Sequence, residues 1–145
     1  MAAGATYYFK IKAKNKWGWG DFSTPASILA ATVPDTMGSV TTSIDAASGG
    51  VQLAWDAPGG TGGVPITSYL IEIQSSDNSW SSDSNCDGST QSIVDARTCI
   101  IPMATLVASP HSLAFDVLVV VRASASNSRG AGPTGPDNTA GARIR

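Results

Sequence analysis

The stretch from Phe115 to Gly132, FDVLVVVRASASNSRGAG, decides how this chain can fold. Its first half alternates with a period of two and is rich in valine, which is typical of a strand with one buried face. Asn127, Gly130 and Gly132 follow, and these residue types favour tight turns because positive φ costs them little. The stretch therefore predicts a long strand over 115–126 that leads into a turn. The residues expected on its buried face are Phe115, Val117, Val119, Val121, Ala123 and Ala125.

The same pattern is also present near the start of the chain. Residues 7–20, YYFKIKAKNKWGWG, alternate in the same way, and Ala-x-Asn-x-x-Gly-x-Gly stands at 13–20 as well as at 125–132. Similarity at a fixed period indicates a repeat array. The early copy is expected to be a hairpin with strands over 5–15 and 24–32. The sequence thus predicts a partial repeat in residues 1–32 and a complete repeat in residues 33–145.

Further alternating segments, separated by turn residues, run through residues 33–145. Seven short strands without a helical period indicate a β-sandwich, and Trp55, Tyr69 and Ile71 are expected in its core together with the valines of the long strand. A glycine-rich run, Gly59–Gly63, is expected to be a flexible loop, because no Gly-Lys-Ser/Thr signature of a phosphate-binding loop follows it. The segments expected as strands are 40–44, 51–56, 66–74, 79–82, 91–101, 115–126 and 140–145.

Three segments of the whole chain resemble the fibronectin type III family. The first, Tyr7-x-Phe9-x-Ile11-x-Ala13-x-Asn15-x-x-Gly18-x-Gly20, is similar to the sixth strand of that family and its turn. Leu53-x-Trp55-x-x-Pro58 resembles the second strand, and Pro65-Ile66-x-x-Tyr69-x-Ile71 resembles the third. The resemblance implies an all-β, seven-stranded fibronectin type III-like β-sandwich preceded by a β-hairpin from a partial repeat. Only Tyr7 is expected to make the family's tyrosine corner, since Val119 takes that place in the second copy.

A more particular resemblance begins at the second cysteine. Cys99-x-x-Pro102-Met103-x-x-Leu106 and the residues after it are similar to the tandem fibronectin type III repeats of large cell-surface proteins of ciliated protists. This implies an extracellular repeat protein with a cysteine pair in each repeat. Cys86 and Cys99 are the only cysteines, and an even count fits a disulfide without proving one. No signal peptide is visible, which suits secretion only if the sequence is a piece of a longer secreted chain.

Charge is distributed unevenly along a chain whose net charge is −2. Residues 1–32 hold four lysines against Asp21, a net charge of +3, whereas residues 33–145 hold five arginines against ten acids, a net charge of −5. A basic segment can bind nucleic acid or anionic lipid. Lysines at every second position are better explained as the solvated face of one strand, so no nucleic-acid partner is expected. The longest apolar run, Val117–Val121, is far too short to span a membrane.

Few residues could carry out chemistry. The single histidine, His111, has no acidic neighbour in the sequence and is expected to be an exposed loop residue, which argues against a Ser-His-Asp hydrolase. Asp77, Asp83 and Asp87 share one polar loop and are candidates for a calcium site. Their spacing matches no known calcium loop, and turn formation explains them better. The sequence therefore predicts no catalytic residue, no metal and no cofactor.

These observations favour a non-enzymatic extracellular structural or adhesion module of a tandem-repeat protein. An accessory module of a secreted carbohydrate-processing enzyme stays open as the alternative, and a free-standing enzyme is a more distant one. An isolated hairpin is marginal in water, and Tyr7, Phe9 and Ile11 would be uncovered on it. Trp17 and Trp19 at its turn are further candidates for contact with a peptide or a sugar. We expect a protein partner or a neighbouring copy at residues 5–32, and head-to-tail repetition of that joint would give an open filament.

Overall fold

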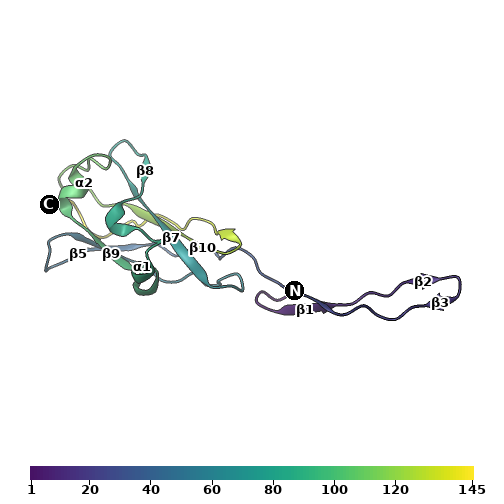
Figure 1. Ribbon diagram of the computed structural model, residues 1–145. Helices are drawn as coiled ribbons and strands as arrows, with labels where there is room; N and C mark the ends of the chain where they lie inside the picture. Colours follow the sequence, from purple (N-terminus) through teal and green to yellow (C-terminus); the bar gives the residue numbers. More distant parts are fainter.

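The computed structural model describes all of residues 1–145. Residues 1–32 form a long two-stranded hairpin that projects away from the rest of the chain, with the β2–β3 turn at its far end (Figure 1). No helix has the length and apolar character needed to cross a membrane. The strands of the hairpin are β1 (Thr6–Phe9), β2 (Lys14–Asn15), β3 (Gly18–Trp19) and β4 (Ala26–Leu29).

Seven strands in two antiparallel sheets make up the remaining unit, which confirms the predicted all-β sandwich. The sheet orders are β5-β6-β9 and β11-β10-β7-β8. The strand β7 occupies the predicted range 66–74. The bounds of the strands are β5 (Thr41–Ile44), β6 (Val51–Ala54), β7 (Ile66–Gln74), β8 (Trp80–Ser81), β9 (Thr98–Ile101), β10 (Val121–Asn127) and β11 (Gly130–Ala131).

The core lies between the two sheets and follows the period of two that the sequence shows. Alternate residues of β6 and β7 are buried, because successive side chains of a strand leave opposite faces. The Trp55 ring meets the Tyr69 ring edge-on, with centroids 5.6 Å apart and planes at 66°. Both side chains are only 6% exposed. The predicted core is confirmed for Trp55, Tyr69, Ile71, Val119 and Val121.

The predicted strand over 115–126 is wrong in its first part. The regular strand begins only at Val121, and Phe115 and Val117 are 80% and 40% exposed instead of buried. The cause is Asp116, whose φ of 60° turns the backbone and interrupts the alternation. Beyond this break the predicted pattern returns. The buried residues on the expected face are Val119, Val121, Ala123 and Ala125.

The predicted strand over 91–101 is also wrong in its first part. Helix α1 (Gln91–Ala96) occupies that part, and only β9 is extended. Ile93 and Val94 are adjacent apolar residues, which a strand with one buried face cannot both bury. The Val94 amide instead donates to the Thr90 carbonyl, and Arg97 ends the helix in the left-handed conformation. Two further short helices are η1 (Ser84–Cys86), which lies in the segment expected to be a polar loop, and α2 (Met103–Val107).

The C-terminal residues 140–145 do not form the regular strand that the sequence predicted. They run beside residues 116–119 and are held by an isolated bridge between Leu118 and Arg143. The Ala142 amide also lies 3.0 Å from the Thr42 hydroxyl of β5, in the other sheet. The C-terminal segment therefore links the two sheets at the end of the sandwich farthest from the hairpin (Figure 1).

Candidate interaction site: the hairpin and its joint

One face of the hairpin is apolar and open to solvent. Tyr7 opposes Ile28, and Phe9 opposes Ala26, so these side chains share a face with Ile11. Phe9 is 50% exposed, Ile11 77% and Ile28 59%. Tyr7 is partly buried, and its hydroxyl accepts a hydrogen bond of 2.8 Å from the Ala2 amide, as expected for a tyrosine corner. The structure thus places Tyr7, Phe9 and Ile11 together on one uncovered surface.

The opposite face of the hairpin carries lysines that lie over aromatic rings. Lys14 opposes Trp19, which puts Trp19 on this face and not with Phe9. The Lys10 ammonium lies 4.3 Å from the Phe22 ring centre, and Lys12 lies 4.8 Å from that of Trp19. At exposed sites each such contact contributes about 0.5–1 kcal/mol. The tryptophans at the turn therefore form a surface separate from the apolar face, and they stay 83% (Trp17) and 60% (Trp19) exposed.

The turn of the hairpin repeats the turn after β10, bond for bond. In each copy the asparagine side chain accepts a hydrogen bond from the amide two residues later, and a glycine at the end of the turn returns a bond to an alanine. The glycine between them has φ of 134° in the hairpin and 129° in the sandwich. The matched bonds are Trp17 N to Asn15 Oδ1 and Arg129 N to Asn127 Oδ1, then Gly20 N to Ala13 O and Gly132 N to Ala125 O.

The base of the hairpin is also repeated in the sandwich. Gly4 and Asp116 both have positive φ, 80° and 60°, and each starts an equivalent set of three backbone bonds. The base and the turn of residues 2–30 therefore have the same backbone bonds as those of residues 114–144, whose returning strand is two residues longer. The matched bonds, with their lengths, are Gly4 N to Ala30 O (2.7 Å) and Asp116 N to Ile144 O (2.9 Å), Ala30 N to Ala5 O (2.9 Å) and Ile144 N to Val117 O (3.0 Å), and Ala5 N to Ala2 O and Val117 N to Ala114 O (both 3.2 Å).

This repetition identifies the free edge of the hairpin. In the sandwich, the side of β10 that faces away from β11 pairs with β7 over seven residue pairs, from Val121 to Asn127. The counterpart of that edge is residues 9–15 of the hairpin, which pair only with the returning strand of the hairpin itself. Their outward amides and carbonyls have no strand beside them. Unpaired edges of this kind are templates for strand addition.

The glycine-rich loop joins the hairpin to the sandwich and does not have the flexible role that the sequence predicted. The Thr32 amide donates to the Gly62 carbonyl at 2.8 Å, and the Asp35 amide donates to the Gly60 carbonyl at 2.9 Å. A Cβ at Gly62 would overlap the Thr32 carbonyl oxygen, and one at Gly63 would overlap the Gly4 amide nitrogen. Only glycine allows two backbones to approach so closely. The loop is therefore a docking surface for the linker and the base of the hairpin.

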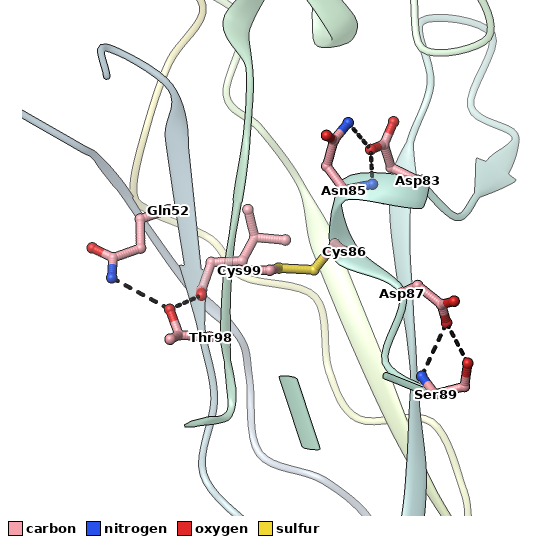
Figure 2. Close-up of a disulfide and its surroundings, with 9 residues drawn as sticks. Gln52, Asp83, Asn85, Cys86, Asp87, Ser89, Thr98 and Cys99 are labelled. Atoms are coloured by element: carbon pink, nitrogen blue, oxygen red, sulfur yellow. Dashed lines mark hydrogen bonds between the residues drawn. A yellow bond between two sulfur atoms is a disulfide. The ribbon is translucent and has the colours of Figure 1, made fainter. Parts of the chain in front are cut away.

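The disulfide predicted between Cys86 and Cys99 is present and buried (Figure 2). Its Cα atoms are 5.3 Å apart, a normal separation for such a bond. Cys86 lies in η1 and Cys99 in β9. The bond therefore ties the polar segment after β8 to the edge of the other sheet, and no cysteine is left free.

The three candidate metal ligands serve separate turns. Asp77 accepts bonds from Ser79, Asp83 from Asn85 and Asp87 from Ser89, the last two of which are drawn in Figure 2. No group of three or more metal-ligating side chains is present. The hydroxyl and amide of Ser79 hold the pKa of Asp77 below its ordinary value, and those of Ser89 do the same for the pKa of Asp87. Each carboxylate therefore stabilises its own turn.

His111 is buried, in contrast to the exposed loop residue expected from the sequence. Its ring is 0% exposed, with Nδ1 3.2 Å from the Ser81 hydroxyl and Nε2 3.4 Å from an Asp83 carboxylate oxygen. The Ser81 hydroxyl also lies 3.3 Å from that of Ser75. A general base must come within hydrogen-bond reach of a substrate proton, and solvent does not reach this ring. The ring therefore connects β8, the residue before η1 and the loop after α2, and its Nε2 lies near the Asp83 carboxylate without a hydrogen bond to it.

No protein-family model matches the chain. Among solved structures it is similar to the chicken CNTN1 FN1–FN3 domains, with a TM-score of 0.53 and 16% identity over 94% of this chain and 42% of that one. It is also similar to titin domains A168–A170, with a TM-score of 0.49 and 23% identity over 90% of this chain and 38% of that one. The chain spans less than half the length of either structure. The CNTN1 likeness supports the predicted fibronectin type III-like fold, while the resemblance to ciliate repeats stays a prediction.

Proposed function

We propose that this chain is a non-enzymatic structural or adhesion module of an extracellular tandem-repeat protein. In this proposal the sandwich is one complete unit, and the hairpin is the closing hairpin of the unit before it. The single observation that carries the proposal is the match of the backbone bonds at the base and at the turn between residues 2–30 and residues 114–144. A buried disulfide is consistent with an oxidising, extracellular location.

The hairpin is the proposed partner-binding element. Its apolar face, with Phe9 and Ile11 exposed, and its free edge at residues 9–15 correspond to surfaces that the sandwich covers with a second sheet and with β7. A protein partner that supplies such strands would bury both surfaces by strand addition. The partner is either the rest of a preceding unit or a neighbouring copy. Repetition of one such heterologous joint between copies would build an open filament.

Sedimentation of the purified chain over a concentration series tests this proposal. We expect self-association that weakens when Phe9→Ser and Ile11→Ser are combined, because both changes remove apolar area from the uncovered face. The matched control is Tyr8→Ser, which removes an exposed aromatic ring from the other face. A strict monomer whose residues 5–32 exchange slowly with deuterium would overturn the proposed partner, because the hairpin would then be stable on its own chain.

An accessory module of a secreted carbohydrate-processing enzyme is the second candidate. The exposed Trp17 and Trp19 at the far end of the hairpin favour it, since aromatic rings at a loop apex can stack on sugars. Affinity electrophoresis in gels with soluble polysaccharides distinguishes the two functions. Retardation that is lost on Trp17→Ala and kept on Phe9→Ser would favour sugar binding over protein docking.

A further inference from the structure

We propose that the turn at residues 114–116, with the chain end after Ile144, is a docking face for the glycine-rich loop of a following unit of the same fold. This inference rests on the proposed tandem-repeat function and adds the site and the partner surface of the second joint. It concerns the end of the sandwich opposite the hairpin, where the C-terminus lies (Figure 1). The argument comes from the first joint, which is occupied.

In the occupied joint, the turn at the base of the hairpin packs on the glycine-rich loop. Gly4 approaches Gly63 so closely that a Cβ at Gly63 would overlap the Gly4 amide. Two residues beyond the paired Ala30, Thr32 donates its amide to the Gly62 carbonyl and accepts a bond of 2.8 Å from the Asn127 side chain. The joint thus has three parts, which are a turn of positive φ, a linker residue and a glycine-rich loop with its asparagine.

The second turn has the same form, and it is contacted by the Arg143 guanidinium, which donates to the Asp116 carbonyl, instead of by a glycine-rich loop. The bonds of Asp116, Val117 and Ala114 reproduce those of Gly4, Ala5 and Ala2. The aromatic ring of Phe115, at the place of Ala3, is 80% exposed. A groove of about 540 Å³ lies beside this turn, lined also by β5 and the last five residues of the chain. The surface that is covered in the first joint is therefore preformed and open in the second.

The side chains at the open turn are compatible with a glycine-rich loop. A Cβ built on Gly4 would lie 3.4 Å from the Gly63 Cα, an ordinary contact, so the Cβ of an aspartate at this place does not by itself exclude the loop. Since Ile144 corresponds to Ala30, the counterpart of Thr32 would be the residue after Arg145. The following unit must then carry glycine at the places of Gly62 and Gly63 and asparagine at the place of Asn127. These features define the partner surface.

A tandem chain tests the inference directly. Residues 32–145 are appended after Arg145, so that the appended Thr32 takes the position of the linker residue. We expect the two sandwiches to share one alignment tensor in residual dipolar couplings. The appended Thr32 amide is also expected to exchange with deuterium at least about tenfold more slowly than an unstructured amide.

Matched variants separate docking from local strain. The double variant Gly62→Ala with Gly63→Ala, made in the appended unit, should release the second joint. The same double variant in the first unit should leave the second joint intact. Asn127→Ala in the appended unit leaves the loop itself unstrained and should also release the joint. Gly59→Ala is a control with little effect, because its Cβ would meet only an Asp35 oxygen at 3.9 Å. Two folded sandwiches that tumble independently in the unmodified tandem would overturn the docking face. That result would leave the module proposal standing, as a flexible string of units.

Discussion

The side-chain amide of Asn127 donates one hydrogen bond to the Thr32 carbonyl, at 2.8 Å, and another to the Thr61 carbonyl, at 2.7 Å. Its oxygen accepts a bond of 2.7 Å from the Arg129 amide. One side chain, only 6% exposed, thus ties the turn after β10 to the linker and to the glycine-rich loop. Because all three of these bonds are partly buried, they fix how the hairpin leaves the sandwich.

Replacement of this asparagine should loosen the joint. Asn127→Ala leaves two carbonyls and one amide without their partner, so we expect a loss of about 1–3 kcal/mol in unfolding free energy, measured by urea denaturation. The matched control is Asn15→Ala, which removes the equivalent side chain where it is exposed and bonds only to the Trp17 amide. A change within about 0.5 kcal/mol is expected there. Equal losses at both sites would contradict the role assigned to Asn127.

The sequence correctly predicted those strands that bury one face against the other sheet. The alternation of Val51, Leu53, Tyr69 and Ile71 was sufficient for β6 and β7, because it reflects one sheet packed on another. The interruption at Asp116 was missed, since its positive φ belongs to a turn held by a bond to Ile144, 28 residues away. A valine-rich run gives no local sign of such a turn.

The joint and the buried histidine were missed for the same kind of reason. Glycines needed for flexibility and glycines needed for close approach look alike in a sequence, and only the position of Thr32 against Gly62 distinguishes them. His111 is buried by Ser81 and Asp83, which lie about 30 residues earlier in the chain. The match between residues 13–20 and 125–132, in contrast, was already visible in the sequence.

Loss of the core tryptophan should be severe. Trp55→Ala would leave a cavity against Tyr69, and we expect it to lower the unfolding free energy by about 3–5 kcal/mol in urea melts. Trp19→Ala, on the exposed face of the hairpin, should cost clearly less, about 1–2 kcal/mol, because it loses only the exposed contacts with Lys12 and Lys14. A loss below about 1 kcal/mol for Trp55→Ala would mean that the packing assigned to Trp55 against Tyr69 is wrong.

The disulfide should be quantitative and stabilising in the purified protein. Thiol titration of the denatured, unreduced chain is expected to find no reactive thiol, because both cysteines are bonded. The bond joins residues 13 apart, and the chain-entropy model gives a loss of roughly 3 kcal/mol on reduction. Two reactive thiols per chain would remove the support for an extracellular location.

Acid should weaken the turns that Asp77 and Asp87 hold. The pKa of each carboxyl is lowered in the folded chain by bonds from a serine two residues later, and the ordinary value is 3.8. A lowered folded pKa means that the stabilisation is complete above the unfolded pKa and is lost as the pH falls through the folded value. Ser79→Ala should return the pKa of Asp77 toward its ordinary value in an NMR titration. The control Ser76→Ala should leave it unchanged.

Substitution of the buried His111 tests whether its role is structural or catalytic. His111→Ala would remove a buried ring from the Ser81 hydroxyl and the Asp83 carboxylate, which keep their contacts with Ser75 and Asn85. One lost hydrogen bond costs about 0.5–1.5 kcal/mol and the cavity left by the ring adds to it, so we expect a loss of at least about 1 kcal/mol in urea melts. The control Ser82→Ala, at an exposed position beside β8, should be neutral. Neither the unmodified chain nor the His111→Ala variant should turn over ester or glycoside substrates. If the unmodified chain turned over a substrate and His111→Ala abolished this activity, the Ser81–His111–Asp83 group would be an enzyme site. The variant must first be shown to be folded, by its intact disulfide and its circular dichroism spectrum.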